Sequence, residues 1–308
     1  MTSWAPRGRS VLAATLTGLV LALAACTRQP VPSPSPHYVL GAPYQVRGVW
    51  WYPDESYDLN ETGLASVIEG DAHRLTTDGE VFDQSALAAA HPTIQLPAVA
   101  RLTNLENGLE VSVRINDRGS GNPTRLVEMT RRTAELLRVP AHGVARVRLR
   151  VLPAESRAAA DAVPGAPSLK LAAAPRGSVE VAALAPPPGI RQGSAHDNGP
   201  YNGPRATPQQ ASADIPVVAP SRLPEIVTQT VPAPGVLMLW LDTFDEFHFA
   251  NIQRAKMSSF GARIVPVIQG RMRRFRVEVG PLPDIARADA ALMQALASGI
   301  PDARIVVD

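Results

Sequence analysis

The chain of 308 residues has one cysteine, Cys26. This excludes an intramolecular disulfide framework and any metal site built from several cysteines. The histidines are scattered along the sequence, and no two of them show the short spacing typical of metal ligands. The sequence therefore predicts neither a metal site nor a bound cofactor.

Charged and aromatic residues are also few, at 19% and 5% of the chain. The formal net charge is only +2, and clusters of lysine and arginine with interleaved aromatic residues are missing, so nucleic acid is not an expected partner. Proline, in contrast, is frequent, with 30 residues. This composition is typical of compact domains joined by unstructured chain, and the length allows two domains.

The apolar run near the N-terminus, residues 11–25, is too short to span a bilayer stably. It follows Arg7 and Arg9 and ends in small residues directly before Cys26, which is the order of an export signal. The arrangement resembles the bacterial lipobox, which implies removal of residues 1–25 and acylation of Cys26. An ordinary signal peptide with a chance cysteine is the alternative.

An acylated cysteine predicts a membrane-anchored protein that faces the periplasm. Several acyl chains on one residue anchor a protein stably in a membrane, because each buried methylene contributes roughly 0.8 kcal/mol. Thr27, and not aspartate, follows the cysteine, and by the same resemblance this favours the outer membrane. Residues 26–43 are rich in proline and serine and are expected to form a tether.

Residues 44–152 are patterned as a small, mainly β domain. Leu109, Val111, Val113 and Ile115 alternate with polar residues, which is the period of a half-buried strand. Asn107-Gly108 predicts a tight turn before this strand. Several short strands with few helices are typical of a small barrel.

The pattern disappears in residues 153–234, which are rich in proline, alanine, glycine and serine and predict a long disordered linker. Periodicity returns in residues 235–308. A strand over 236–241, a helix that ends at Gly261, strands over 263–268 and around 275–279, a helix up to Gly299 and a strand over 303–307 are expected. The order βαββαβ predicts a ferredoxin-like α/β domain.

Four short motifs occur in order in the first domain: Gly63-Leu64-Ala65-Ser66, the stretch from Thr76 to Asp83, the stretch from Ala88 to Thr93, and Asn116-Asp117-Arg118-Gly119. Together they resemble the rare lipoprotein A (RlpA) family, which implies a six-stranded double-psi β-barrel and the activity of a septal lytic transglycosylase. The C-terminal segment resembles the SPOR domain, which binds glycan strands stripped of stem peptides.

The resemblance implies that Asp117 is the catalytic carboxylate and that His91 and Glu80 accompany it in the active site. From position alone, Asp117 before Arg118-Gly119 is also ordinary turn chemistry. His91 before Pro92 would pass as a surface histidine, and Glu80 would pass as a solvated loop carboxylate. Arg118 is expected to point away from Asp117 or to contact the substrate.

The sequence departs from the family pattern at four places. Val67-Ile68 replaces an aromatic pair that would offer a sugar-stacking surface, and Thr77-Asp78-Gly79-Glu80 replaces Thr-Ala-Asn-Gly-Glu. Ser120 stands where proline is usual, and Glu128 stands where aspartate is usual. The aromatic residues at 50–52 could replace the lost pair only if the fold brings them close.

In the C-terminal domain, Arg274 and Arg276 alternate with the expected core residues of one strand. Spaced guanidiniums could pair with the lactyl carboxylates that peptide-free muramic acid exposes, although an ordinary solvated strand face is the alternative.

The sequence therefore predicts an endolytic lytic transglycosylase that acts on peptide-stripped glycan, is lipid-anchored in the outer membrane and is enriched at the septum, with division proteins as further partners. The rival hypothesis is a wall-binding lipoprotein that keeps the barrel without turnover.

Overall fold

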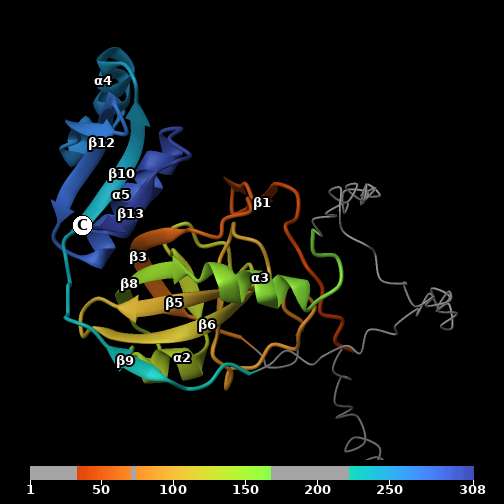
Figure 1. Cartoon of the computed structure of the whole chain (residues 1–308). Helices are drawn as coiled ribbons and strands as arrows, with labels where there is room; N and C mark the ends of the chain where they lie inside the picture. Colours follow the sequence, from red (N-terminus) through yellow and green to blue (C-terminus); the bar gives the residue numbers. More distant parts are fainter. Residues whose placement is uncertain (1–32, 71–73, 168–221) are drawn as a thin grey trace, which may run out of the picture. The chain divides into compact units, whose positions relative to one another are not determined.

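The computed structural model describes residues 33–70, 74–167 and 222–308 (Figure 1). These residues form a β-barrel and a C-terminal α/β domain. The predicted lipobox at Cys26 and most of the predicted linker lie outside the described residues. Within the described ranges, no helix has both the length and the apolar character that crossing a bilayer requires.

The barrel is a closed ring of six strands. They are β3 (Asn60–Val67), β4 (Ala88–Ala90), β5 (Ala98–Asn104), β6 (Leu109–Asp117), β7 (Val127–Met129) and β8 (Val144–Val151). Their order around the ring is β4-β7-β3-β8-β5-β6, and β6 closes the ring by pairing with β4. The β3–β7 and β4–β6 pairs are parallel, and the others are antiparallel. The predicted six-stranded barrel is confirmed.

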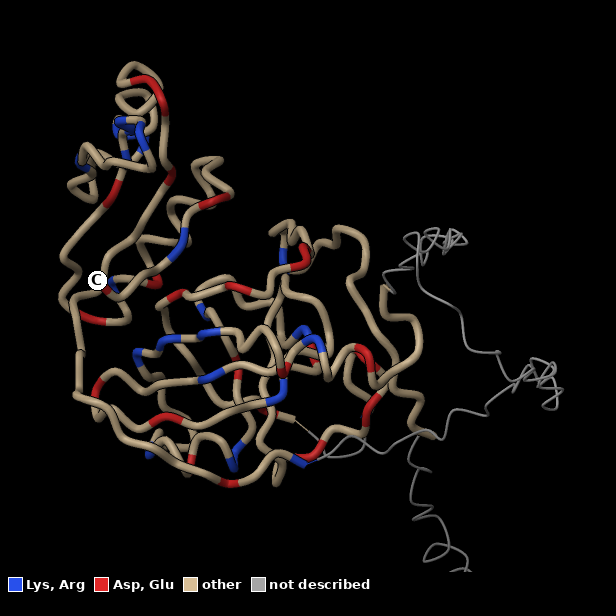
Figure 2. The backbone as a smooth tube through the Cα atoms, in the orientation of Figure 1, with Lys and Arg blue, Asp and Glu red and all other residues tan. Residues whose placement is uncertain are grey.

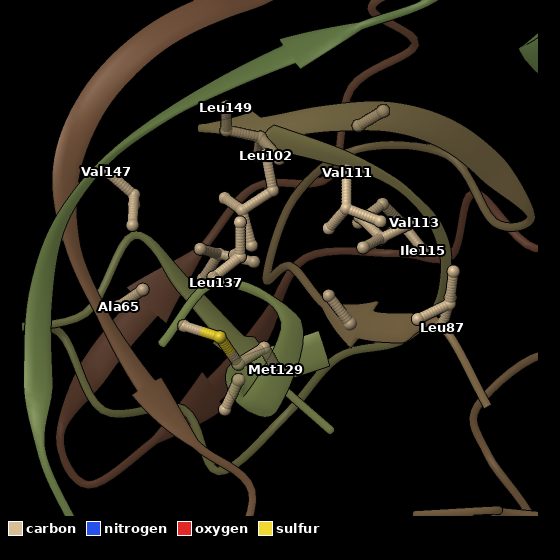
Figure 3. Packing of buried hydrophobic residues seen from close by; sticks show 14 of the residues in the cluster. Ala65, Leu87, Leu102, Val111, Val113, Ile115, Met129, Leu137, Val147 and Leu149 are labelled. Atoms are coloured by element: carbon tan, nitrogen blue, oxygen red, sulfur yellow. The ribbon is translucent and has the colours of Figure 1, made fainter. Parts of the chain in front are cut away.

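Strand β6 shows why the sequence folds in this way. Val111, Val113 and Ile115 are buried in the barrel core, and the polar residues between them are only partly buried (Figure 3). Leu102 from β5 and Leu149 from β8 meet them there. Each buried side chain of this size contributes roughly 1.5–3 kcal/mol, so the alternating pattern fixes which face of the strand points inward.

The barrel carries one short helix between β7 and β8, α2 (Arg131–Leu136). Thr130 caps its first turn, since the Thr130 side chain accepts a hydrogen bond from the Thr133 backbone N–H. The residue after the helix, Leu137, is fully buried in the core cluster.

The ordered barrel continues beyond Leu152, so the predicted start of the linker is wrong. Helix α3 (Pro153–Asp161) packs against β5, and the Ser156 hydroxyl donates to the Val99 carbonyl at 2.8 Å and accepts from the Val99 N–H at 3.0 Å. The helix is rich in alanine, and the hydrogen bonds between Ser156 and Val99 come from one small polar side chain. The sequence of α3 therefore lacks the large apolar residues that would predict an ordered element.

The predicted end of the linker is wrong as well. Strand β9 (Val227–Gln229) pairs antiparallel with β6, with Leu109 opposite Gln229. All three residues of β9 are exposed, so side-chain burial does not place this strand. The backbone N–H and C=O groups at the open edge of β6 accept a partner of almost any sequence.

A separate hairpin precedes the barrel and consists of β1 (Tyr44–Val46) and β2 (Val49–Trp51). Its two turn residues, Arg47 and Gly48, have φ angles of 52° and 82°, the positive values that a type I′ turn requires. The Tyr44 hydroxyl donates to the Pro92 carbonyl at 2.8 Å and so ties the hairpin to the segment that follows β4.

The C-terminal domain has the predicted order βαββαβ. Its elements are β10 (Leu237–Phe244), α4 (Phe247–Lys256), β11 (Arg263–Gln269), β12 (Met272–Leu282), α5 (Ile285–Ala297) and β13 (Arg304–Val307). The sheet order is β11-β12-β10-β13, with antiparallel pairs throughout. Val277 and Val279 are fully buried, as the pattern predicts. In α4, however, Ala250 is the buried residue, while Phe249 and Ile252 are exposed.

Candidate active site

Asp117 is the last residue of β6 and lies opposite Ala90 of β4 in the parallel pair that closes the barrel. Its Oδ1 atom accepts hydrogen bonds from the Thr77 hydroxyl at 2.7 Å, the Thr77 N–H at 3.1 Å and the Arg118 N–H at 2.9 Å. Its Oδ2 atom accepts one from Arg74 Nη1 at 2.7 Å. Two backbone groups and one short side chain therefore hold Oδ1 in place, whereas Oδ2 contacts a long side chain.

Asp117 lines a groove of about 670 Å³ on the barrel. The groove also contains Arg47 at the tip of the β1–β2 hairpin, Arg74, and Val67 and Ile68 at the end of β3. The positions where the family has an aromatic pair thus form an aliphatic wall, and Ile68 packs with Phe82 and Ala90.

Arg74 is a site residue that the sequence analysis missed. Its guanidinium lies 4.1 Å above the ring centre of Phe82, and its backbone carbonyl accepts from the Phe82 N–H at 2.9 Å. The side chain remains 39% exposed while it contacts Asp117. Nothing in the local sequence marks this arginine, because the barrel fold brings together residues 43 positions apart.

Glu80 does not share the groove with Asp117. It lies against a second cavity of about 240 Å³, together with Arg114 and Asn116. Arg114 donates to Glu80 Oε1 through Nε and Nη2, both at 2.7 Å, and Asn116 Nδ2 donates to Oε2 at 2.8 Å. A buried carboxylate with this set of partners holds the Thr76–Glu80 loop against β6, and the catalytic role of Glu80 stays a prediction.

Asp78, in the same loop, is also buried. Its Oδ1 accepts from the Thr76 hydroxyl at 2.7 Å and from the Glu80 N–H at 3.2 Å, but its Oδ2 has no hydrogen-bond partner within residues 33–70, 74–167 and 222–308. Burial, followed by the nearby charge of Glu80, raises the pKa of Asp78 to about 7. The family pattern has asparagine here, so this chain carries an additional titratable group next to the residue that holds Asp117, Thr77.

His91 is buried beside the site and is held by backbone groups. Its Nδ1 accepts from the Thr93 N–H at 3.2 Å and from the Ile94 N–H at 3.3 Å, which places the ring proton on Nε2. Burial, with a smaller effect of Arg118, lowers the pKa of His91 to about 3. The imidazole is therefore neutral near pH 7. The His91 backbone N–H donates to the Asp117 carbonyl at 2.9 Å, so the two residues are joined through the main chain.

Arg118 points away from Asp117, which is one of the two orientations expected. Its guanidinium donates to the backbone carbonyls of His91 and Ile94, and to that of Leu40 at 2.7 Å. Arg118 thus joins the segment around His91 to the segment around Leu40, and its contact with the substrate stays a prediction.

The loop after Asp117 depends on Gly119 and Glu128. Gly119 has a φ of 75°, and a Cβ atom there would lie 2.8 Å from Glu128 Oε2 and 3.2 Å from Ala90 Cβ. Glu128 accepts from the Ser120 N–H at 2.8 Å and from the Ser120 hydroxyl. Glycine at this position therefore lets the loop approach β7 closely, and Glu128 fixes it there.

Trp50 and Trp51 belong to β2, and Tyr52 follows it directly. Trp50 and Tyr52 are 53% and 64% exposed, and their rings stack at 6.4 Å with an interplanar angle of 29°. Trp51 faces the segment around Gly121 and Glu128. The hairpin tip reaches the groove through Arg47, but Trp50, Trp51 and Tyr52 do not line it.

Both predicted glycan-binding arginines of the C-terminal domain have acidic partners. Arg274 Nε donates to the exposed Asp245 at 2.6 Å. Arg276 Nε donates to the buried Glu278 at 3.1 Å, and its guanidinium lies 4.0 Å above the ring centre of Trp240. Charged residues of both signs are spread over the chain (Figure 2). Among the residues in view, no group of histidine, cysteine, aspartate or glutamate is arranged to hold a metal ion.

Comparison with known proteins matches these features to one family. A family model described as "Lytic transglycolase" covers residues 60–149. Over 258 residues, the chain is 31% identical to the "Endolytic peptidoglycan transglycosylase RlpA" of Pseudomonas aeruginosa strain PAO1, covering 82% of this chain and 72% of that protein. The chain belongs to the RlpA family.

Other RlpA relatives match shorter stretches. The proteins of the same name from Rickettsia bellii and Yersinia pestis are 32% and 42% identical over 124 and 83 residues. The match to the Rickettsia bellii protein covers 39% of this chain and 55% of that protein, and the match to the Yersinia pestis protein covers 27% and 23%. A crystal structure of the RlpA SPOR domain from Pseudomonas aeruginosa aligns with 23% of this chain and 99% of its own, at 19% identity and a TM-score of 0.22.

Proposed function

We propose that this protein is an endolytic peptidoglycan transglycosylase that cleaves the bond from N-acetylmuramic acid to N-acetylglucosamine in peptide-stripped glycan. The observation that carries the proposal is the place of Asp117, a carboxylate held at Oδ1 by three hydrogen bonds and lining a groove of the barrel. Membership of the RlpA family supports the same reaction.

One carboxyl group is enough for this chemistry. In the proposed reaction, Asp117 gives a proton to the oxygen of the departing N-acetylglucosamine as that oxygen separates from C1 of muramic acid. The C6 hydroxyl of the same muramic acid then bonds to C1, and its proton passes to Asp117. The proton is thereby returned, and the product is a 1,6-anhydro sugar. No water is activated, so the second carboxylate of ordinary glycosidases is not required.

The other predicted catalytic residues act as positioning groups in this scheme. Neutral His91 fixes the segment after β4 and cannot donate a proton as an imidazolium near pH 7. Glu80 holds the loop that carries Thr77, and Thr77 orients Asp117 through two hydrogen bonds.

Digestion of purified sacculi tests the proposal directly. Sacculi with and without stem peptides are incubated with the protein, and the soluble products are identified by mass spectrometry. We expect anhydro-muramic products from peptide-stripped sacculi. Hydrolysed products with a free reducing end, or the absence of products from every preparation, would contradict the proposal.

The aliphatic wall of the groove favours a second candidate, a wall-binding protein without turnover. Val67 and Ile68 offer a smaller surface for a sugar ring than an aromatic pair would. In that case, the protein would bind peptide-stripped sacculi and release no fragments.

We also propose that the protein is anchored by lipid at Cys26 in the outer membrane, facing the periplasm, and that its C-terminal domain holds glycan strands at the division septum. The succession of basic residues, apolar run and small residues before Cys26 supports the lipid anchor. The βαββαβ fold supports the glycan-holding role. Cys26→Ala should move the protein from the membrane fraction to the soluble periplasmic fraction. Membrane retention of a mature Cys26→Ala protein would contradict the lipid anchor.

A further inference from the structure

We propose that Arg74 forms a carboxylate-binding subsite in the groove, which takes the free lactyl carboxylate of a peptide-free muramic acid in exchange for Asp117. The inference rests on the proposed function and identifies the residue that would distinguish peptide-free glycan from peptide-bearing glycan.

The two oxygens of Asp117 are held unequally. Oδ1 accepts three hydrogen bonds, two from backbone N–H groups and one from the short Thr77 side chain. Among the residues that the structure describes, the only partner of Oδ2 is Arg74. If the arginine turns away, Asp117 keeps its position, and the oxygen that faces the groove becomes free.

Arg74 is held on an aromatic ring. Its guanidinium rests on the face of Phe82, which is 3% exposed and therefore a fixed platform. A stacked guanidinium can turn within its plane and offer its N–H groups to a new acceptor without leaving the ring. Because the side chain is 39% exposed, a ligand in the groove can reach it.

The pair of Arg74 and Asp117 also matters for proton transfer. A carboxylate that accepts an ion-pair hydrogen bond at Oδ2 has no proton there to give, so the pair with Arg74 is a resting arrangement. A substrate carboxylate is the natural competitor for the same N–H groups, since it matches the fork of the guanidinium. Once bound, it places a like charge near Asp117, which favours proton uptake by Asp117 and so prepares the acid.

Only one kind of muramic acid carries this competitor. In peptide-bearing glycan, the lactyl group is an amide and has no negative charge. In peptide-free glycan, it is a free carboxylate. The exchange at Arg74 therefore links loss of the stem peptide to release of the catalytic oxygen.

The test uses peptide-free glycan in two forms, as the free acid and after conversion of its carboxyl groups to methylamides with methylamine and a carbodiimide. The full-length protein, Arg74→Gln, Arg74→Lys and a control, Arg131→Gln, are compared. Arg131 is an exposed residue of α2 outside the groove.

We expect wild type and Arg131→Gln to digest the free acid roughly 10- to 100-fold faster than the methylamide, the usual loss when a charge-assisted hydrogen bond is removed. Arg74→Gln should digest both forms at one low rate, and Arg74→Lys should recover part of the preference. Merely structural support of Asp117 by Arg74 would instead slow both forms equally and leave the ratio unchanged.

Equal rates of wild type on both forms, or an unchanged ratio in Arg74→Gln, would overturn the subsite. If wild type releases nothing from any glycan, the proposed function fails, and the subsite is then judged by binding. The Kd for soluble free-acid fragments should still be lower than that for methylamides in wild type, and the two should be equal in Arg74→Gln.

Discussion

Ser120 donates two hydrogen bonds to the carboxylate of Glu128, one from its backbone and one from its hydroxyl. These are two of the positions at which the chain departs from the family pattern, where proline and aspartate are usual. Proline has no N–H to donate, so it needs no acceptor there. Serine requires one, and the longer side chain of glutamate reaches it. The two departures are therefore a matched pair that keeps the loop after Asp117 in place.

We expect the effects of Ser120→Ala and Glu128→Gln to be coupled. Each single variant weakens the same contact, so the loss of unfolding free energy in the double variant should be smaller than the sum of the two single losses, by about 0.5–2 kcal/mol. Denaturant unfolding of the four proteins measures this coupling. Simple additivity would mean that the pair contributes nothing specific to the loop.

Asp117→Asn should abolish formation of anhydro products while the barrel stays folded. Asparagine keeps the shape of the side chain, but it can neither donate nor accept the transferred proton. Losing this help costs roughly two to four orders of magnitude in rate. The measurement is the release of anhydro-muramic products from peptide-free sacculi. Digestion by Asp117→Asn at the wild-type rate would show that another group is the acid.

His91→Ala is the companion variant, and its rate should fall between those of wild type and Asp117→Asn. The neutral ring organises the backbone at Thr93 and Ile94, so its loss disturbs the site without removing the proton carrier. A loss as large as that of Asp117→Asn would instead place His91 in the chemistry itself.

Asp78→Asn should stabilise the protein at neutral pH. The folded pKa of Asp78 is raised to about 7, so the folded state binds more protons than the unfolded state between about pH 4 and 7. Stability is lost as pH rises through this window, and the penalty is constant above it. Asparagine avoids the penalty, so the gain should grow from pH 4 to 7 and reach on the order of 1–3 kcal/mol. Thermal unfolding at pH 4.5 and pH 8 checks this, and an equal gain at both values would contradict it.

Arg274→Ala and Arg276→Ala should behave differently in the C-terminal domain. Arg276 faces Glu278, which is 3% exposed, so its loss leaves a buried carboxylate oxygen short of a partner and costs roughly 1–3 kcal/mol. Arg274 pairs with an exposed acid, and its loss should change stability by less than about 1 kcal/mol. Arg274→Ala is therefore the clean test of glycan holding.

If Arg274 contacts glycan, Arg274→Ala should bind peptide-free sacculi more weakly in a sedimentation assay and with less dependence on salt. Arg276→Lys serves as a control that keeps the charge beside Glu278. Unchanged binding by Arg274→Ala at low and moderate salt would show that Arg274 is an ordinary solvated residue without a contact to glycan.

Local patterns predicted much of the fold. The alternation along Leu109–Asp117 identified β6, and the order of elements after residue 235 identified the α/β domain. The local patterns missed α3 and β9. Ser156 joins α3 to the barrel and backbone pairing joins β9 to it, and neither contact leaves an apolar pattern in the sequence.

The candidate site was predicted less completely, for a different physical reason. Asp117 could be found because its motif is continuous in the sequence. Arg74, by contrast, becomes a site residue only through the fold, which sets it on Phe82 and against a strand end far along the chain. Glu80 was assigned to the site because it belongs to a motif, but its side chain points to the cavity of Arg114.

Because β9 pairs with the barrel, the proline-rich segment does not directly precede the C-terminal domain. The chain enters residues 168–221 from the region of α3, packed on the barrel, and from Arg222 onward it contacts the barrel again, through Asp83 and then through β6. In topological terms, the segment is an insertion that leaves and returns to one body, and residues 230–236 lead from β9 to β10. Lengthening or shortening the insertion would therefore leave the length of chain between β9 and β10 unchanged. A protease that nicks the insertion would yield two fragments that stay associated until denaturant separates β9 from β6.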